Sequence, residues 1–300
     1  MKIKNNHILC FGEVLWDRLP TGAKPGGAPM NVALHLHAAG MNASIASCVG
    51  NDEAGNQLLS FLQNSGLQTN LIQIDKNLPT SEVLVHLDAK NNATYEICEP
   101  VAWDNIILSK ALRNKVEHSG LLVYGSLAAR NPVTRETLLQ LRNTDVVKLM
   151  DVNLRPPYDM PEVVELLIHK SDIVKLNDDE LKRIASWNKL KGSEAELVEW
   201  LSNHYDLKLL CVTRGANGAL LYSNNTFYNH SGYKIKTVDT VGAGDAFLSG
   251  LIAALLKELE PSNALELACA TGAFVASKAG ATPKYDTDEI EQIMKQDYEK

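Results

Sequence analysis

Short apolar runs alternate with helix-period stretches through most of this chain of 300 residues. The runs are rich in Val, Ile and Leu and do not alternate polar with apolar side chains, which is typical of strands buried on both faces of a sheet. The alternation predicts an α/β fold: a doubly wound, mostly parallel sheet flanked by helices. The predicted strands lie in residues 7–12, 43–50, 120–126, 146–153, 172–177 and 208–215.

One stretch interrupts this rhythm at a place where a crossover helix is expected. Residues 81–98 contain alternating segments on both sides of Lys90-Asn91-Asn92, a pattern typical of a β-hairpin. We predict a small β-structure outside the main sheet, joined by the strand-like segment around residue 17. From residue 244 onward the pattern changes again and predicts consecutive helices.

Charge and cysteine content restrict the class of ligand and the compartment. A net charge of -7 argues against a nucleic-acid-binding protein, although a local pocket can still bind a small anion. Five scattered cysteines without a CxxC pair are typical of reduced thiols. No run approaches the roughly 20 apolar residues that span a bilayer, and the N-terminus lacks a signal-peptide pattern. We expect a cytoplasmic protein that binds neither nucleic acid nor a membrane.

The motif DTVGAGDAFLSG, residues 239–250, places a carboxylate beside glycines at the start of an apolar helix. Gly242 and Gly244 permit backbone conformations closed to other residues, so the amides of Ala243, Gly244 and Asp245 can converge on an anion. Asp245 would face the same point. A base beside an anion hole is what phosphoryl transfer to a hydroxyl requires. The alternative is a glycine turn in which Asp245 is an ordinary first-turn acid.

Three further motifs contain groups suited to polar ligands. PGGAPMNVA, residues 25–33, again sets glycines before a helix, with an Asn in the first turn that can bind a polyol. NDDE, residues 177–180, and TRGANG, residues 213–218, follow consecutive predicted strands, where ligands bind in open sheets. The first can hold hydrated Mg²⁺ and phosphate oxygens, and the second can surround a nucleotide. Each motif taken alone also has a structural explanation. NDDE, for example, is a good helix start with Asn177 as its cap.

Together these motifs resemble the PfkB (ribokinase-like) family of sugar kinases over nearly the whole chain. PGGAPMNVA is similar to the N-terminal signature of the family, DTVGAGDAF to its C-terminal signature, and NDDE to its Asn-x-x-Glu motif. The order and spacing also agree. Within the family, the combination of FGEVLWD (residues 11–17), PGGAPMNVA and DVNLRPP (residues 151–157) looks most like a fructokinase.

The resemblance implies a ribokinase-like domain over residues 1–300, with a β lid formed by about 13–22 and 80–101, and transfer of phosphate from MgATP to a sugar. It assigns Asp245 as the general base and the anion hole to Gly242, Ala243 and Gly244. The sugar-binding positions match Asp17, Gly27, Asn31 and Arg155. The nucleotide-side positions match Asn177, Thr213, Gly215 and Gly218. Glu180 matches a residue that organises Mg²⁺ through water, and a K⁺ site of several members matches Asp239, Val241, Ala276, Ala279 and Ala281. Many members form homodimers through their lids.

Several other functions remain as alternatives to a fructokinase. Ribokinase-type members carry a sugar-binding glutamate where Gly125 and Ser126 stand here, which argues against ribose. Other sugar substrates within the family are 2-keto-3-deoxygluconate and an aminosugar. A sugar-binding regulator without activity is a further alternative, but the intact GAGD and NDDE motifs argue against it. A dinucleotide oxidoreductase is disfavoured because GEVLWD, not GxGxxG, follows the first strand.

Overall fold

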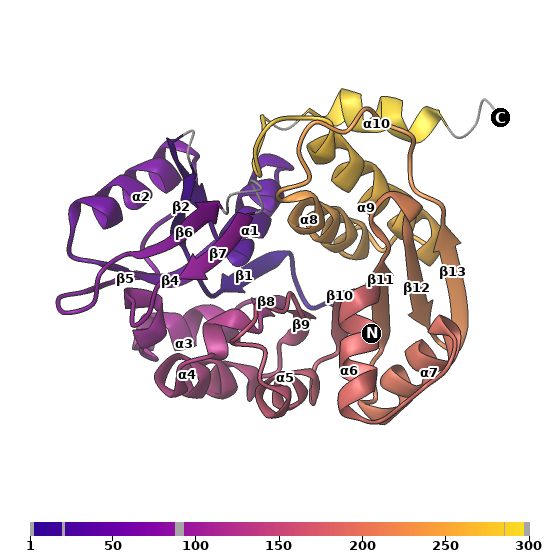
Figure 1. The fold of residues 1–300 in the computed structure, drawn as a ribbon, viewed down its shortest axis with the longest axis horizontal. Coiled ribbons are helices and arrows are strands. Elements are labelled where there is room, and N and C mark those ends of the chain that lie inside the picture. The colour runs from indigo at the N-terminus through magenta and orange to yellow at the C-terminus, as the bar shows by residue number, and fades with distance from the viewer. Residues whose placement is uncertain (1–2, 20–21, 88–92, 285, 297–300) are drawn as a thin grey trace.

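A nine-stranded sheet forms the centre of the molecule in the computed structural model, which describes residues 3–19, 22–87, 93–284 and 286–296 (Figure 1). Its strands are β1 His7–Phe11, β4 Asn42–Gly50, β5 Ile72–Asp75, β8 Leu121–Gly125, β9 Val147–Asp151, β10 Ile173–Asn177, β11 Leu209–Thr213, β12 Ala219–Ser223 and β13 Thr226–His230. Their order is β13-β12-β11-β10-β9-β8-β1-β4-β5. Pairing is parallel from β11 to β5, and only the pairs made by β12 are antiparallel.

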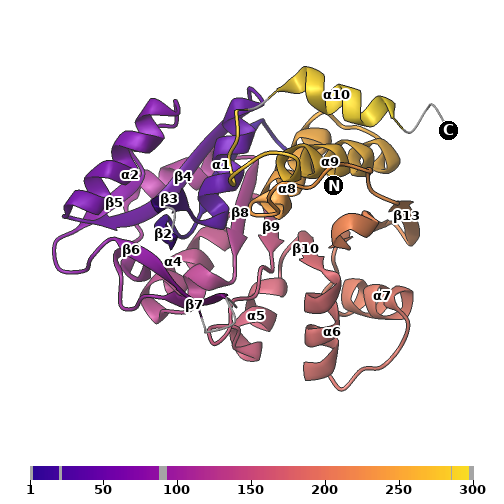
Figure 2. The same cartoon turned by 45° about the horizontal axis from the view of Figure 1, so that its top comes forward.

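Helices cover both faces of this sheet, as Figure 2 also shows. One core contains side chains of α1 Ala28–Ala38, α2 Glu53–Asn64, α8 Ala243–Leu256, α9 Pro261–Ala276 and α10 Thr287–Lys295. The other contains side chains of α3 Lys110–Glu117, α4 Pro132–Arg142, α5 Pro161–Ile168, α6 Asp178–Trp187 and α7 Glu194–His204. Three short 3₁₀ helices are η1 Ala102–Asn105, η2 Leu127–Ala129 and η3 Gly215–Asn217.

Strand β1 shows why the predicted strands are apolar throughout. Ile8 and Cys10 enter the first core, whereas Leu9 and Phe11 enter the second. Successive side chains of a strand point to opposite faces, and here both faces are covered by helices. The predicted doubly wound, mostly parallel α/β fold is therefore confirmed, including the consecutive helices α8, α9 and α10.

The antiparallel edge formed by β12 and β13 was not predicted from the sequence. Its turn contains Asn224 and Asn225, whose φ angles are 49° and 58°. Two consecutive positive φ angles are characteristic of a tight hairpin turn, and Asn tolerates them better than most residues. The Asn-Asn pair was the available signal. Strand β5 and helix α3 also lie outside the predicted elements.

A separate four-stranded sheet lies beside the large one, with the strand order β3-β2-β6-β7. Its strands are β2 Leu15–Leu19, β3 Gly22–Gly26, β6 Ser81–Leu87 and β7 Ala93–Ile97. The predicted hairpin is confirmed by the antiparallel pairing of β6 with β7. The predicted turn at Lys90-Asn91-Asn92 lies outside the described residues. Strand β3, which extends beyond the expected segment 13–22, also belongs to this sheet.

A buried ion pair anchors the chain where it leaves β7. The guanidinium group of Arg130 donates from Nε and Nη2 to the two carboxylate oxygens of Asp104, at 2.8 and 2.9 Å. Nη2 also donates to the carbonyl of Cys98 at 2.8 Å. The same group stacks on Trp103 and Tyr158, at 4.0 and 4.5 Å from the ring centroids. Arg130 therefore connects the small sheet to η1 and to the segment after β9.

Among the residues that the structure describes, no helix combines the length and apolar character needed to cross a membrane.

Candidate active site

The GAGD motif forms the N-terminus of α8. Gly242, the N-cap, has φ 77° and ψ −4°, and a Cβ there would lie 2.6 Å from Cα of Ala281. Only glycine suits both this left-handed conformation and this close approach. No side chain caps the helix. The amide of Ala243 donates to the preceding turn at 3.2 Å, whereas the amides of Gly244 and Asp245 have no acceptor among the described residues. Such amides at a helix N-terminus favour an anion.

Asp245 faces the first turn of α1. Nδ2 of Asn31 donates to Oδ2 of Asp245 at 2.8 Å, joining two motifs that are distant in the sequence. Burial raises the pKa of Asp245 to about 6; the hydrogen bond from Asn31 opposes the rise, Asp151 adds to it, and Lys175 and Arg155 oppose it. A general base works best when its pKa lies near the operating pH. A carboxyl group with this pKa, beside the amides at the start of α8, can accept a proton near neutral pH.

A buried Lys–Asp pair lies close to the same helix end. Nζ of Lys175 on β10 donates to both carboxylate oxygens of Asp151 on β9, at 3.0 and 3.1 Å. A Cβ built on Gly244 would be 3.4 Å from that Nζ. Burial lowers the pKa of Lys175, but the carboxylates of Asp151, Glu180 and Asp245 outweigh this effect, so the net pKa is raised and the cation persists. Lys175 therefore supplies fixed positive charge beside the candidate anion hole.

Sequence reasoning missed this pair, although a signal was present. Lys175 lies between apolar residues in β10, Asp151 follows two apolar residues at the end of β9, and both charged side chains are buried. They also stand at the same register position of adjacent parallel strands. Buried charges are costly unless they are paired, so two such residues in neighbouring strands predict each other.

The NDDE motif forms a capping box at the start of α6. The side chain of Asn177 accepts the Glu180 amide at 2.8 Å, and Oε2 of Glu180 accepts the Asn177 amide at 2.8 Å. Oε1 of Glu180 accepts the Leu154 amide, also at 2.8 Å. Burial raises the pKa of Glu180, with Asp151 adding to the rise. The capping explanation of this motif is thus confirmed, and it fixes the Glu180 carboxyl group near Lys175 and Asp151.

The remaining nucleotide-side candidates lie at the carboxyl end of β11. Thr213 pairs in register with Asn177 across β10 and β11. Gly215 is exposed in η3 with φ 56°. Gly218 has φ 78°, and a Cβ there would meet the His230 carbonyl oxygen at 2.0 Å. Packing of the β12–β13 hairpin therefore explains Gly218 without any ligand. Within the described part of the chain, no backbone hydrogen bond joins the two glycines to Asp245.

The sugar-side candidates gather around the start of the small sheet. A Cβ on Gly26 would lie 2.4 Å from Oδ2 of Asp17, so this carboxylate rests on bare backbone. Burial raises the pKa of Asp17, and Arg155 opposes the rise. Arg155 is exposed. Its positive charge also opposes the rise in the pKa of Asp245 and of Glu13, although the net pKa of both groups is raised. One cation thus lies within electrostatic reach of three carboxyl groups.

Glu13 is a second buried carboxyl group that sequence reasoning missed as a site residue. Its side chain is 3% exposed, and its pKa is raised to about 7 because of burial. The signal was its position, since it interrupts the apolar segment that follows the first strand. Gly27, a predicted sugar-side residue, packs against it: a Cβ on Gly27 would lie 2.4 Å from the Glu13 carbonyl oxygen.

The candidate K⁺ residues are brought together by two loops. The carboxylate of Asp239 accepts the amides of Val241 at 3.0 Å and Gly280 at 3.1 Å. The carbonyl of Ala276 accepts the amides of Val238 and Asp239, at 2.9 and 3.3 Å. The carbonyl of Ala281 contacts Nε2 of the buried His35 at 2.9 Å. These carbonyls therefore already have protein partners. Ala279 is exposed and makes no backbone hydrogen bond to any described residue outside the regular helices and strands.

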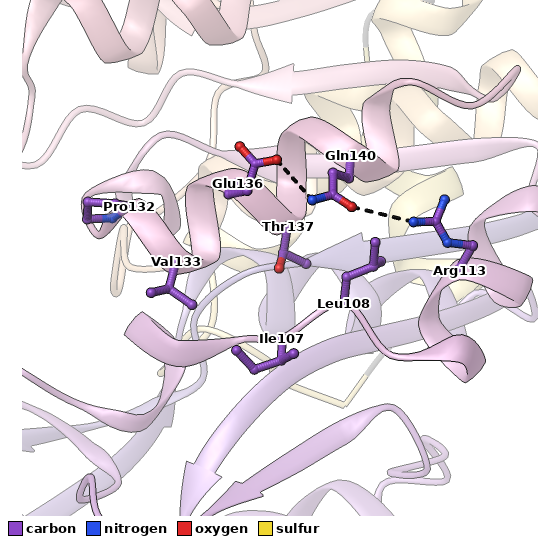
Figure 3. Close-up of a pocket in the computed structure, with 8 residues that line it drawn as sticks. All are labelled: Ile107, Leu108, Arg113, Pro132, Val133, Glu136, Thr137 and Gln140. Carbon is purple, nitrogen blue, oxygen red and sulfur yellow. Dashed lines mark hydrogen bonds between the residues drawn. The ribbon is translucent and has the colours of Figure 1, made fainter.

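An open pocket elsewhere on the molecule is distinct from this site. Figure 3 shows it between α3, α4 and the segment before α3, with Gln140 bonded to Glu136 at 2.9 Å and to Arg113 at 3.4 Å. Ile107 and Val133 expose apolar side chains there. None of the residues lining this pocket belongs to the motifs described above.

The arrangement around α8 defines a class of enzyme. It combines a carboxylate of raised pKa, a buried lysine, and helix N-terminal amides with no acceptor among the residues that the structure covers, all at the carboxyl edge of a doubly wound sheet. These are the groups that take a proton from an alcohol and stabilise a transferred phosphoryl group. The fold and the site thus define a phosphotransferase that acts on an alcohol group.

Comparison with known proteins identifies the family. A model of the pfkB family carbohydrate kinases matches residues 10–288, so the chain belongs to this family of sugar kinases. It is 28% identical over 309 residues to "Fructokinase-2" of Solanum habrochaites, covering 93% of both chains. A structure of a fructokinase double mutant from Vibrio cholerae O395, bound to fructose, ADP and a potassium ion, has a TM-score of 0.82 at 22% identity, covering 96% of this chain and 98% of the other. Aminoimidazole riboside kinase from Salmonella enterica, bound to its riboside and an ATP analogue, has a TM-score of 0.78 at 23% identity and coverages of 96% and 100%.

Proposed function

We propose that this sugar kinase is an ATP-dependent fructokinase, converting D-fructose and ATP to fructose 6-phosphate and ADP. One observation carries the proposal of a catalytic site: the carboxylate of Asp245, with its pKa raised to about 6, stands at the N-terminus of α8 beside amides that have no acceptor in the described part of the chain. The choice of fructose is supported by fructokinase relatives in plants and bacteria that are 28% identical over most of this chain.

In the proposed mechanism, Asp245 takes the proton of the sugar hydroxyl as that oxygen attacks the terminal phosphorus of ATP. The proton ends on Oδ of Asp245, and the bond to the leaving ADP oxygen breaks. Asn31 orients the carboxylate through its hydrogen bond of 2.8 Å. The amides of Gly244 and Asp245 and the cation of Lys175 stabilise charge on the transferred phosphoryl oxygens. Each group acts on charge that develops during transfer.

The donor set fits a hydrated Mg²⁺ held mainly by phosphate. Among the described residues, no three His, Cys, Asp or Glu side chains are grouped to hold a metal ion on their own. Mg²⁺ usually keeps several waters and binds one or two carboxylates together with substrate phosphates. Glu180, buried beside Asp151, would hold such an ion through water, and Mg²⁺ would neutralise phosphate charge. Asn177, Thr213, Gly215 and Gly218 would face the nucleotide.

A coupled ADP-release assay with several sugars tests the substrate. We expect fructose to give a kcat/KM at least about tenfold above ribose, 2-keto-3-deoxygluconate, an aminosugar and a nucleoside, since one well-placed hydroxyl contact is worth at least that factor. Higher kcat/KM for another sugar would reject fructose but keep the kinase. If calorimetry shows that a sugar binds but no sugar causes ADP to be released, the protein would instead be a sugar-binding regulator without kinase activity. The nucleoside is included in the assay because a riboside kinase has the same fold.

The same assay tests the proposed K⁺ site at Asp239, Val241, Ala276, Ala279 and Ala281. A cation there would strengthen the positive field of the anion hole. At constant ionic strength, activity should therefore be higher in K⁺ than in tetramethylammonium. Equal rates in K⁺, Na⁺ and tetramethylammonium would reject the site.

Asp17→Asn should affect sugar binding more than the chemical step. The proposal has this carboxylate hold sugar hydroxyls equally in the ground and transition states, which are the interactions that set KM. We expect the KM for fructose to rise by at least about tenfold, with a smaller fall in kcat. Steady-state kinetics measure both constants. A fall in kcat at unchanged KM would place Asp17 in the chemistry instead.

We further propose that the small sheet is a lid that closes over bound sugar. It is joined to the site through Asp17 and to the main domain through the indole N–H of Trp16, which donates to the Ala54 carbonyl at 3.0 Å. Closure would exclude water that competes for the phosphoryl group. Hydrogen exchange in β6 and β7 should slow when fructose is added. Equal exchange with and without fructose would contradict this. We also propose that two chains pair through this sheet; light scattering, which measures the mass of the particle in solution, should then give the mass of a dimer.

A further inference from the structure

Helix α1 has two buried polar side chains on one face, those of Asn31 and His35. They are four positions apart, a spacing that places side chains one above the other on a helix. Asn31 is 5% exposed and His35 is 2% exposed. Nδ2 of Asn31 donates to the Asp245 carboxylate at 2.8 Å, and Nε2 of His35 lies 2.9 Å from the carbonyl oxygen of Ala281. One face of α1 therefore contacts both the proposed base and the segment that joins α9 to α10.

The hydrogen bond between His35 and Ala281 has a defined donor. A carbonyl oxygen can only accept, so Nε2 of His35 carries the proton. Burial lowers the pKa of His35 to about 4, and the bond to the Ala281 carbonyl opposes that effect. The ring is therefore neutral near neutral pH, with its proton on Nε2. A buried donor that lost this acceptor would cost free energy, which favours keeping Ala281 in place.

Ala281 packs directly against the N-cap of α8. A Cβ on Gly242 would lie 2.6 Å from both Cα and the carbonyl oxygen of Ala281. The neighbouring Gly280 donates its amide to the Asp239 carboxylate at 3.1 Å. The segment that joins α9 to α10, drawn in yellow, passes beside α1 in both views (Figures 1 and 2). This segment is therefore held by Asp239 through Gly280 and by His35 through Ala281.

The position of Gly242 determines where the first turn of α8 lies. The Ala246 amide donates to the Gly242 carbonyl at 2.9 Å, which is the first hydrogen bond of the helix. The amides of Gly244 and Asp245 lie within this turn. A shift of Ala281 away from Gly242 would release the turn and move these amides relative to the phosphoryl group that they are proposed to hold.

We propose that His35 is a positioning residue of this kinase: its bond to the Ala281 carbonyl holds Ala281 against Gly242, the first residue of the anion hole. The amides of Gly244 and Asp245, in the same turn, are fixed as a consequence. The inference rests on the proposed phosphoryl transfer at this helix end, but not on fructose as the substrate. His35 itself touches neither the sugar nor the phosphate, and its effect on the rate passes through Ala281.

Loss of the bond should weaken transition-state binding and leave sugar binding intact. His35→Leu fills the buried site but removes the donor, and kcat should fall by about tenfold or more, because a misplacement of about 1 Å can cost about a hundredfold. Affinity for ADP with aluminium fluoride, a mimic of the phosphoryl group in transfer, should fall by a similar factor. The Kd of fructose, or of whichever sugar the ADP-release assay selects, should change by less than about threefold. Calorimetric titration of the sugar measures this Kd and counts the folded sites.

Two further variants separate the hydrogen bond from packing. His35→Gln keeps an N–H donor near the position of Nε2, so kcat and the affinity for ADP with aluminium fluoride should stay within about threefold of wild type. His37→Leu is the matched control on the same helix. Nε2 of His37 would lie 2.5 Å from a Cβ on Gly66, so this ring packs against the turn after α2 and not against Ala281. His37→Leu should leave kcat unchanged.

Three outcomes would overturn the role of His35: a kcat of His35→Leu within about threefold of wild type, an equal loss in His35→Gln, or a sugar Kd that rises as much as that of the aluminium fluoride complex. If His35→Leu does not fold, His35→Gln and the wild-type ring still test the proposal. Nitrogen-15 NMR of the wild-type protein should show the proton of His35 on Nε2. A proton on Nδ1 would contradict the bond. If Asp245→Asn were fully active, the proposed function would fail independently of His35.

Discussion

Asp245→Asn should lower kcat by about 10²- to 10⁴-fold, the usual contribution of a general base, or roughly 3 to 5 kcal/mol at the barrier. The amide keeps the shape of the side chain and can still accept a hydrogen bond from Asn31, which now lies 2.8 Å from Oδ2. It cannot take the sugar proton. Fructose binding should therefore survive in calorimetry while turnover is lost, and steady-state kinetics measure the change.

The pH profile of the wild-type enzyme tests the role of Asp245 as general base independently. The pKa of Asp245 is raised to about 6, mainly by burial. The base must be ionised to act, so kcat/KM should fall as the pH drops through about 6. Asp245→Asn should not show this limb, since its residual activity needs no ionised carboxylate at this position.

A matched control separates a base from an ordinary first-turn acid. Asp288 occupies the first turn of α10, is exposed, and is not among the candidate site residues. Asp288→Asn should leave kcat unchanged and alter stability by less than about 1 kcal/mol, the range of helix-dipole effects. If Asp245→Asn kept more than about a tenth of the wild-type kcat, Asp245 would have only the dipole role that Asp288 has.

Arg130→Met should destabilise the protein by about 3 to 5 kcal/mol. Arg130 and Asp104 are each 3% exposed at their side chains and share two hydrogen bonds of 2.8 and 2.9 Å. Removing the cation leaves a carboxylate uncompensated in the interior, and that desolvation cost produces most of the effect. The free energy of unfolding in urea measures it.

Two further variants show whether the burial of the pair is the cause. The double variant Arg130→Met with Asp104→Asn should recover a large part of the loss, because no buried charge is then unpaired. Lys208→Met removes a cation from an exposed pair with Asp206, at 2.9 Å, and should cost no more than about 1 kcal/mol. A loss below about 1 kcal/mol in Arg130→Met itself would show that Asp104 is solvated or protonated without its partner.

Elements whose cause is local could be predicted from the sequence. The central strands are apolar because both faces of the sheet are buried, and apolar residues in the helices recur at helical spacing. The doubly wound sheet could therefore be predicted from the pattern of apolar residues. The capping box of Asn177 and Glu180 lies within four consecutive residues and could be predicted in the same way. The antiparallel edge of β12 and β13 was missed, because its only signal was the turn at Asn224 and Asn225.

The tertiary structure alone decided which of these groups meet. The carboxylate of Asp245 reaches Asn31 across 214 residues, and Lys175 reaches Asp151 because their strands pair in register. Periodicity and capping preferences depend on neighbours along the chain, whereas such contacts depend on how distant elements pack. The sequence therefore determined the fold class and marked the glycine loops, and the packing of α1, α8 and the strand ends determined the site.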